Sequence, residues 1–266
     1  MRAMFRRTFA LAAALAACGS STQQTQSTTP SASSSASAPP ASSAIEAAVS
    51  APDRSADDRA LDAGRHPAEM LAFFGIAPGM KVAELGAGRG YTTELLARVV
   101  GDSGRVFAVN NKTLLGFVGD DYAKRLAQPA LKNVVRVDRE YDDAFDASVT
   151  GLDAVICVLV YHDFVWMKVD RDKMNRAVLA ALKPGGVYGI VDHSAKAGAG
   201  ETEVQTTHRI EQSALVDEIT RAGFKLAGEA QFLRNPRDTR DWNDSPRAAG
   251  DKRGTSDRFV LKFVKP

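Results

Sequence analysis

The sequence predicts an α/β fold, a doubly wound, seven-stranded and mostly parallel sheet with a terminal antiparallel hairpin. From about residue 81 onward, strand-like apolar runs alternate with helical patterns, which is typical of βαβ units. One run, residues 154–160, is continuously apolar, as expected of a strand buried on both faces of a parallel sheet. The last two runs have no helix between them, so they can form the closing hairpin.

The expected strands lie at residues 81–84, 105–109, 134–137, 154–160, 187–191, 224–233 and 258–264. The first expected helix of the sheet domain starts at Pro67, which suits a first helical turn, and ends at Gly75. The next helix follows a glycine-rich stretch and places its leucines and valines on one face. Further helices are expected at residues 119–126 and 171–182, and before Gly223.

The first 17 residues resemble a bacterial lipoprotein signal peptide. Three arginines precede a short apolar run, and Leu15-Ala16-Ala17-Cys18 resembles a lipobox. Processing there would make Cys18 a lipidated N-terminus that anchors the protein to a membrane. The residue after the cysteine is Gly19 and not Asp. By the bacterial lipoprotein sorting pattern, we therefore expect the protein to be anchored at the periplasmic face of the outer membrane. Arg6-Arg7 fits either a twin-arginine signal or an ordinary basic segment.

The composition predicts one folded domain behind a tether. Residues 18–44 are mostly Ser, Thr, Ala, Gln and Pro, which predicts a disordered segment. The remaining part, residues 45–266, suits a single α/β domain. Cys157 is the only cysteine in that part, so no disulfide framework is expected, and its apolar neighbours indicate a small buried side chain.

Charge and hydropathy narrow the expected partners. The chain has 34 Lys and Arg residues against 32 Asp and Glu, and removal of the three arginines of the signal leaves a net charge of −1. This balance gives no electrostatic argument for a nucleic-acid partner. No run after the signal approaches the roughly 20 apolar residues of a membrane-spanning helix.

A glycine-rich stretch directly follows the first expected strand. Glu84 ends that strand, and Gly86, Gly88 and Gly90 follow at alternate positions. Glycines let the backbone approach a ligand closely, and the start of the next helix offers free N–H groups. The arrangement indicates a site for a nucleotide-type cofactor. Dinucleotide folds use G-x-G-x-x-G, but the sixth position here is Tyr91.

An acid, one residue and then G-x-G-x-G resembles the class I S-adenosylmethionine-dependent methyltransferases. Two later stretches also fit this family: Asp153 leads through an apolar run to Tyr161-His162-Asp163, and Lys183-Pro184-Gly185-Gly186 precedes the fifth strand. The resemblance spans about residues 67–265, and it extends to bacterial predicted methyltransferases of unassigned substrate. It implies a class I methyltransferase-like Rossmann fold with S-adenosyl-L-methionine as cofactor.

The resemblance also implies which residues hold the cofactor. Glu84 would orient the turn by bonding backbone N–H groups or the amino group of the cofactor, and Gly86 and Gly88 would pass under the methionine and ribose. The family normally ends strand two in an acid that takes the ribose hydroxyls, whereas this chain has Asn110 or Asn111, which lack the charge. Asp138 and Glu140 would either face the adenine or form a solvated acidic loop. The expected contacts are Glu84, Gly86, Ala87, Gly88, Gly90, Tyr91, Asn110, Asn111, Asp138 and Glu140.

The reacting groups are expected beyond the carboxyl ends of the strands, where open α/β sheets bind ligands. His162 is either the base that takes a proton from the methyl acceptor or a structural histidine bonded to backbone. A connection at about residues 235–257 reaches the same edge, and Trp242 within it favours a docked lid. The candidate catalytic residues are His162, Asp163, Asp192 and His193.

The remaining histidines carry weaker signals. His66, His162, His193 and His208 lack the spacing of metal-ligand pairs, so no metal site is expected. His208-Arg209 is interpreted as the start of a helix. Arg65-His66 is interpreted as a solvated helix entrance, with a cap over the substrate site as the alternative.

Three functions are compatible with these patterns. The leading one is an enzyme that methylates an unidentified small molecule with S-adenosylmethionine. The alternative is a membrane-anchored binding or scaffold protein on a non-catalytic methyltransferase fold. It is favoured by Asn110 and by the export of the protein away from the cytoplasm, where the cofactor is made. A nicotinamide-dependent oxidoreductase is a third possibility, which Tyr91 and the missing acid disfavour.

Overall fold

The computed structural model describes residues 40–266, in which seven strands form one sheet in the order β3-β2-β1-β4-β5-β7-β6. The first five strands pair in parallel, and β7 is antiparallel to both β5 and β6. The predicted fold class, including the closing antiparallel strands, is therefore confirmed. The strands are β1 (Lys81–Leu85), β2 (Arg105–Asn110), β3 (Val134–Asp138), β4 (Leu152–Val158), β5 (Leu182–His193), β6 (Lys225–Ala230) and β7 (Arg258–Val264).

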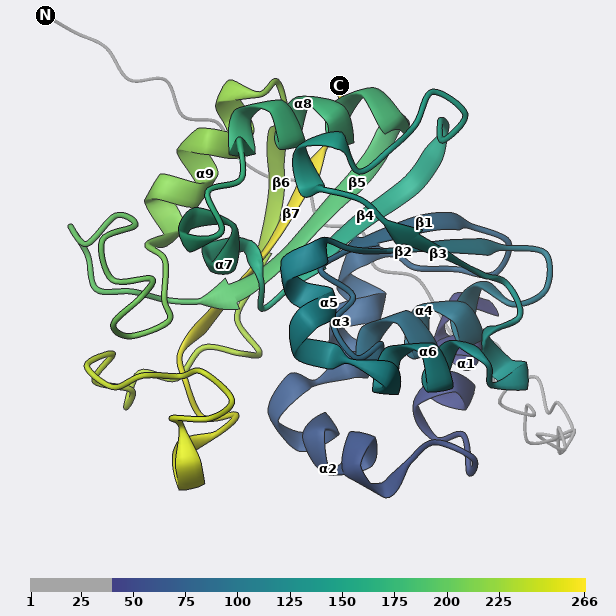
Figure 1. Ribbon diagram of the computed structural model, residues 1–266, viewed down its shortest axis with the longest axis horizontal. Coiled ribbons are helices and arrows are strands. Elements are labelled where there is room, and N and C mark those ends of the chain that lie inside the picture. Colours follow the sequence, from purple (N-terminus) through teal and green to yellow (C-terminus); the bar gives the residue numbers. More distant parts are fainter. Residues whose placement is uncertain (1–39) are drawn as a thin grey trace, which may run out of the picture. The chain divides into compact units, whose positions relative to one another are not determined.

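Helices cover both faces of the sheet, as Figure 1 shows, with α8 and α9 on one side and α1, α3 and α4 on the other. The α-helices are α1 (Pro40–Val49), α2 (Ala56–Arg65), α3 (Pro67–Phe74), α4 (Tyr91–Val100), α5 (Lys112–Val118), α6 (Asp120–Leu126), α7 (Tyr161–Trp166), α8 (Arg171–Ala181) and α9 (Gln212–Arg221). Three short 3₁₀ helices are η1 (Pro129–Leu131), η2 (Tyr141–Asp143) and η3 (Gly250–Lys252).

The apolar faces of most of these helices form two large cores, one on each side of the sheet, and Val118 of α5 and Tyr122 of α6 lie in a third, small cluster. Met174 and Val178 of α8 and Leu215 of α9 are buried in one core. Leu71 of α3 and Leu95 of α4 are buried in the other. Strands β1 and β4 contribute side chains to both cores, which explains why the predicted strand around Cys157 is continuously apolar.

Several boundaries differ from the predicted ones. Strand β4 ends at Val158, because Leu159 takes up a positive φ of 57° and turns the chain into α7. The Lys-Pro-Gly-Gly stretch lies inside β5, where the register with β4 shifts at a bulge. The helix expected at 119–126 is α6, and a further helix, α5, which was not predicted, precedes it and is separated from it by Gly119.

The N-terminal helix α1 begins at Pro40, five residues before the expected start of folded sequence at Ile45. Ile45 and Ala48 are buried against α3 and α4, so this segment belongs to the core. The predicted signal peptide, Cys18 and most of the predicted tether lie outside the described residues.

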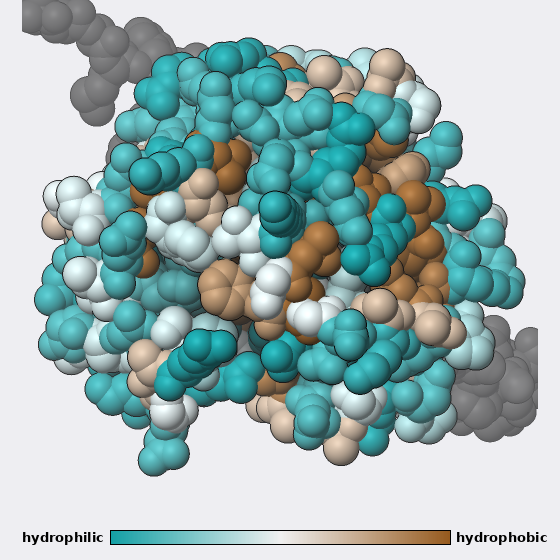
Figure 2. Space-filling view, viewed as in Figure 1, coloured by the Kyte–Doolittle hydropathy of each residue, from teal (hydrophilic) through white to brown (hydrophobic). Residues whose placement is uncertain are grey.

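The surface of the described part is mainly hydrophilic on the face shown in Figure 2, with hydrophobic groups gathered in the middle and at the right of that view. Within residues 40–266, Phe117 and Leu226 are the large apolar side chains that are exposed. None of the helices in this range has the length and apolar character needed to cross a bilayer.

Candidate functional site

The glycine turn connects β1 to α4 at the carboxyl edge of the sheet. Gly86, Gly88 and Gly90 all have positive φ, at 73°, 57° and 87°. The N–H groups of Gly86 and Ala87 donate to the Val109 carbonyl of β2, at 3.0 and 3.1 Å, which ties the turn to the neighbouring strand. A Cβ atom on Gly86 would lie 2.6 Å from Val160, so only glycine fits there. Around Gly88, in contrast, the same position is open.

Glu84 lies under this turn and is almost fully buried. Its carboxyl accepts a hydrogen bond from the Thr93 hydroxyl on α4, where the sequence had suggested backbone N–H groups of the turn. Burial raises the pKa of Glu84 to about 7, because the charged form is poorly solvated, although the threonine hydroxyls favour ionisation. Glu84 therefore fixes the start of α4 against the end of β1.

Asn110 ends β2 and holds the turn from the other side. Its Oδ1 accepts from the Gly88 N–H at 2.9 Å, and its Nδ2 donates to the Gly88 carbonyl at 3.1 Å. The side chain is completely buried. Both of its polar atoms are thus engaged with the backbone of the turn, where the family resemblance implies a ribose contact.

The other predicted cofactor residues lie in three different surroundings. Asn111 caps α5 by accepting from Leu114 N–H at 2.9 Å, and it donates to Glu140 at 3.0 Å, so these two lie together. Asp138 is bonded to Arg136 on the exposed surface of β3. Tyr91 starts α4, and its hydroxyl donates to Asp62 at 2.6 Å.

The segment before α3 packs over Tyr91 and so lies beside the turn. The Arg65 guanidinium sits over the Tyr91 ring, 4.4 Å from its centroid. His66, in contrast, is exposed and paired with Glu69. Arg65 thus packs on the first residue of α4, while His66 matches the solvated helix entrance.

A histidine cluster lies at the ends of β4 and β5. His162, in the first turn of α7, is completely buried, and its Nδ1 lies 2.6 Å from Asp192 Oδ1 of β5. Asp192 also accepts from the backbone N–H groups of His162 and His193, both at 2.8 Å. The other ring nitrogen, Nε2, is 3.3 Å from Asp163 Oδ1. All four predicted catalytic residues therefore lie together at the expected edge.

The charge on His162 differs from that expected of a catalytic base, which has to be neutral to accept a proton. Burial alone would lower the pKa of His162, but the charges of Asp192 and Asp163 outweigh it and raise the pKa to about 10. Burial raises and His162 lowers the pKa of Asp163, with a net fall to about 2. At neutral pH His162 is thus positively charged, with Asp192 at Nδ1 and Asp163 beside Nε2.

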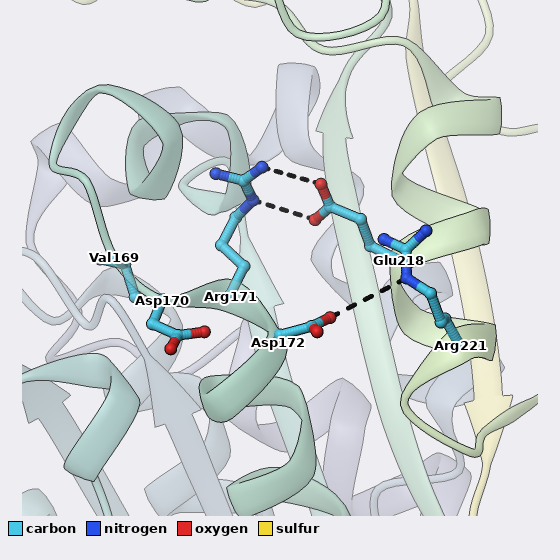
Figure 3. A pocket seen from close by; sticks show the side chains of 6 residues that line it. All are labelled: Val169, Asp170, Arg171, Asp172, Glu218 and Arg221. Atoms are coloured by element: carbon cyan, nitrogen blue, oxygen red, sulfur yellow. Dashed lines mark hydrogen bonds and ion pairs between the residues drawn. The ribbon is translucent and has the colours of Figure 1, made fainter.

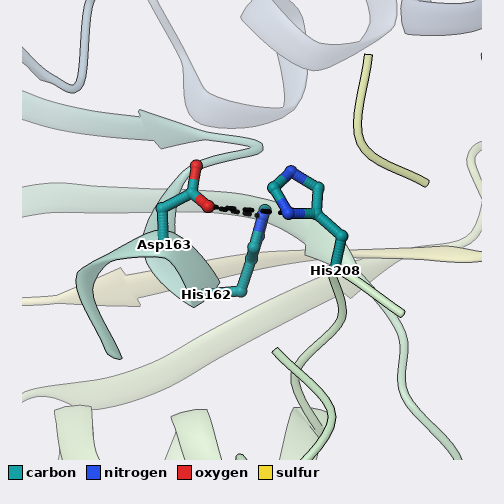
Figure 4. Close-up of side chains that lie close together, drawn as sticks. All are labelled: His162, Asp163 and His208. Carbon is teal, nitrogen blue, oxygen red and sulfur yellow. Dashed lines mark ion pairs between the residues drawn. The ribbon is translucent and has the colours of Figure 1, made fainter. Parts of the chain in front are cut away.

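His208 completes the cluster and was missed as a site residue. It does not start a helix, since α9 begins at Gln212; it has a positive φ of 62° instead. Its ring lies edge-on to that of His162, with centroids 4.1 Å apart, and its Nδ1 is 3.6 Å from Asp163 Oδ1 (Figure 4). Burial lowers the pKa of His208 to about 4, and the charge on His162 adds to this effect. The polar loop before His208 gave no periodic signal.

The connection after β6 is docked on the same edge, as its Trp242 predicted. Asp244 from this connection contacts His193 Nδ1 at 2.5 Å, and the Ser256 hydroxyl lies 3.0 Å from the same atom. Trp242 donates to Asp238 at 2.8 Å, and its ring stacks with the buried Arg209. His193 is therefore held by the connection and is not paired with His162.

A surface cavity of about 400 Å³ lies between the start of α8 and α9 (Figure 3). Its charged residues pair across it: Arg171 makes two hydrogen bonds to Glu218, at 2.8 and 2.9 Å, and Arg221 faces Asp172. These pairs join the two helices, which gives the cavity a structural role.

Sequence comparisons relate the first half of the sheet to methyltransferases. Residues 49–149 match the family model of protein-L-isoaspartate(D-aspartate) O-methyltransferase. The protein-L-isoaspartate O-methyltransferase of Thermotoga maritima is 30% identical over 127 residues, which cover 44% of this chain and 32% of that protein. The ubiquinone/menaquinone biosynthesis C-methyltransferase of Vibrio campbellii is 28% identical over 124 residues, or 45% and 44% of the two chains. The matches thus span less than half the length of these relatives.

Solved structures extend the likeness to the whole sheet. A SAM-dependent methyltransferase from Aquifex aeolicus superposes with a TM-score of 0.53 at 17% identity, covering 74% of this chain and 88% of the other. An S-adenosylmethionine-dependent methyltransferase from Mesorhizobium loti gives 0.53 at 14% identity, covering 77% and 99%. The fold is that of class I methyltransferases, as the glycine spacing predicted.

Proposed function

We propose that the protein is an S-adenosyl-L-methionine-dependent methyltransferase that acts on a small-molecule acceptor. One observation carries this proposal: strand β1, the buried Glu84, the glycine turn and α4 form a continuous unit at the carboxyl edge of a class I methyltransferase sheet. The match to a methyltransferase family model covers this same unit.

The residues of the turn fit the proposed cofactor. The space beside the Gly88 Cα is open, so a ligand can approach there while Asn110 holds the Gly88 N–H and carbonyl. Helix α4 begins three residues later, at Tyr91, and no side chain caps its first N–H groups. Glu140 and Asn111 lie together just beyond the ends of β3 and β2, where an adenosine group would extend. Asn110 would act indirectly, by holding Gly88 in its conformation.

The bound cofactor would supply an activated methyl group on its sulfonium. The protein has to align the acceptor with that methyl group and to receive any proton that the acceptor loses. We place the acceptor at the histidine cluster, because His162, Asp163, Asp192 and His193 gather on the carboxyl edge that also holds the turn. The related proteins are named as O- and C-methyltransferases, so the proposal specifies the reaction and the cofactor, with the acceptor atom open.

Isothermal titration calorimetry of the full chain tests the cofactor. We expect a Kd for S-adenosylmethionine in the micromolar range or below, and absence of binding at millimolar concentration would overturn the proposal. Gly88→Asp should abolish binding, because it puts a carboxylate on the open side of the turn while its left-handed backbone tolerates Asp. Gly75→Asp is the matched control, since this glycine is also left-handed and has open space around it but ends α3.

Asn110→Asp separates two roles of that side chain. If Asn110 turns to the ribose on binding, the added charge should tighten S-adenosylmethionine binding. If it stays on Gly88, the carboxylate would face the Gly88 carbonyl, and binding should weaken along with stability. A wild-type chain that binds no cofactor would favour the alternative of a non-catalytic scaffold, which the present bonds of Asn110 suit.

A further inference from the structure

We propose that His162, Asp163 and His208 bind a divalent transition-metal ion at the carboxyl edge of the sheet. This inference goes beyond the proposed methyl transfer and does not depend on it. The sequence predicted no metal site, because His208 lies 46 residues from His162 and shows no ligand spacing. The fold brings the three side chains together, pointing toward one another from α7 and from the loop before α9 (Figure 4).

The distances between the three donor atoms suit a metal ion. His162 Nε2 and Asp163 Oδ1 are 3.3 Å apart, and His208 Nδ1 and Asp163 Oδ1 are 3.6 Å apart. All three atoms lie within 4.8 Å of one another. Tetrahedral zinc with bonds of about 2.0–2.1 Å separates its ligand atoms by about 3.3 Å. The ligand set therefore needs only small side-chain shifts to enclose an ion.

His162 offers an independent sign of a missing ligand. Its ring is completely buried, yet Nε2 forms no hydrogen bond, and this nitrogen points into the space shared with Asp163 and His208. A buried polar atom without a hydrogen bond is costly, by about 1–3 kcal/mol, so such atoms usually have a partner. A metal ion on Nε2 would provide that partner.

Asp192 holds the metal-binding ring of His162 from behind. It lies 2.6 Å from His162 Nδ1 and accepts two backbone N–H groups, so its own orientation is fixed. Metal-binding histidines usually donate their second ring N–H to a carboxylate in this way, which sets the tautomer and the ring orientation. Asp192 thus directs Nε2 of His162 toward the ion. Together, Asp163 and Asp192 balance a charge of +2.

The cluster is closed on one side and accessible on the other. His162 is fully buried, whereas the side chains of Asp163 and His208 retain 14% and 18% of their exposure, so an ion can enter between them. His193 does not join the set, because Asp244 and Ser256 occupy its Nδ1. Three protein ligands leave at least one position for water or a substrate oxygen, as in catalytic rather than structural sites.

The donor atoms indicate which ions would bind. Two imidazole nitrogens and one carboxylate favour Zn²⁺, Fe²⁺ or Co²⁺ over Mg²⁺ and Ca²⁺, which prefer oxygen ligands. The competing interpretation is that a protonated, positively charged His162 pairs with Asp163 and Asp192 and that no metal binds. An experiment on the full chain distinguishes these two states.

Cobalt is a suitable probe because its visible spectrum reports its ligands. We expect metal-free full-length protein to bind about one equivalent of Co²⁺ with visible ligand-field bands, and excess Zn²⁺ but not excess Mg²⁺ to displace it. A thiolate charge-transfer band in the near ultraviolet would indicate binding to a cysteine and would contradict the proposal. Absence of visible bands at stoichiometric Co²⁺ would also overturn it.

Variants test the ligand assignment. His208→Ala should weaken Co²⁺ binding at least 100-fold, and Asp192→Asn should weaken it about 10- to 100-fold through the orientation of His162. His66→Ala is the control, since His66 is exposed outside the cluster, and it should bind as the wild type does. Unchanged binding in folded His208→Ala would refute the site.

A measurement on the wild-type protein tests the ligands even if a variant fails to fold. Nitrogen-15 spectra of the histidine rings should show zinc-induced shifts at two histidines and none at His66. Zinc added to one equivalent without any ring shift would overturn the proposal. Neither readout requires S-adenosylmethionine, so failure of the proposed methyl transfer and failure of the metal site are distinguishable.

Discussion

Glu84 shows how burial alters a single acid at the base of the glycine turn. Its side chain is 3% exposed and its partner is the neutral hydroxyl of Thr93. Because no cation makes a hydrogen bond or ion pair with it among the described residues, burial raises its pKa to about 7. Near neutral pH this carboxyl is therefore partly protonated in the folded state, whereas in the unfolded chain it is ionised.

Glu84→Gln should change the pH dependence of stability. The raised folded-state pKa means that the contribution of Glu84 is fully present below about pH 4.5 and is lost as the pH rises through 7. Gln lacks this loss, so stability of the variant relative to wild type should improve by about 2–3 kcal/mol between pH 5 and pH 8. Urea unfolding at several pH values measures the difference. A difference that stays constant with pH would contradict the assignment.

Site residues were predictable where the signal is local. The glycine turn and Glu84 are recognised from a few adjacent positions. His162 and Asp163 directly follow the apolar run of residues 154–160, and Asp192 and His193 end β5. His208 and Asp244 come from irregular loops whose course depends on tertiary contacts, such as the buried pair of Arg209 and Asp238. No sequence period marks such positions.

The connection from β6 to β7, residues 231–257, acts as an ordered element although it has little regular structure. Asp238 organises it: the carboxylate accepts from Arg209 at 2.8 Å, from the Trp242 indole at 2.8 Å and from the Asp257 N–H at 2.6 Å. Arg209 and Asp238 are both fully buried. The same connection carries Asp244 to His193, so its order positions part of the histidine cluster.

Asp238→Asn should loosen this connection. The substitution keeps the shape but leaves the buried Arg209 without a counter-charge, and breaking such a pair costs about 3–5 kcal/mol. We expect a drop of that size in the free energy of unfolding, with faster hydrogen exchange in residues 235–257. Asp251→Asn, in an exposed part of the same connection, is the control and should match wild type. Wild-type exchange rates in Asp238→Asn would refute this role.

Element types were predictable more reliably than element ends. The alternation of apolar runs and helical patterns predicted the first five strands, because parallel strands must be apolar on both faces. The last two strands were predicted from two further runs with no helix between them. The end of β4 at Val158 was not predictable, since the apolar run continues through Val160 while Leu159 turns the chain. Val160 is apolar for another reason: it packs on Gly86.

At the scale of the whole molecule, the strand order brings the turn and the histidine cluster to one edge. Strand β1 carries the turn and pairs with β4, which leads into His162, and β4 pairs with β5, which ends in His193. This adjacency follows from the order of the strands in the sheet. The start of the domain was harder to predict, because the Ser- and Ala-rich start of α1 has the composition of a tether.

The inclusion of α1 in the domain leads to a prediction about cooperativity. Ile45 is 3% exposed and belongs to the core formed by α3, α4 and the sheet. Ile45→Ala should therefore lower the global free energy of unfolding by about 2–4 kcal/mol, because it leaves a cavity in that core. Glu46→Ala, on the exposed face of the same helix, should have little effect.

Two probes of urea unfolding test whether the loss is global. Circular dichroism follows all helices, whereas the fluorescence of Trp166 and Trp242 reports on α7 and on the β6–β7 connection, which are separate from α1 in the fold. If α1 is part of one cooperative unit, Ile45→Ala should shift both transitions equally, and they should still coincide. An early loss of helix signal with unchanged fluorescence would instead show that α1 unfolds independently of the sheet.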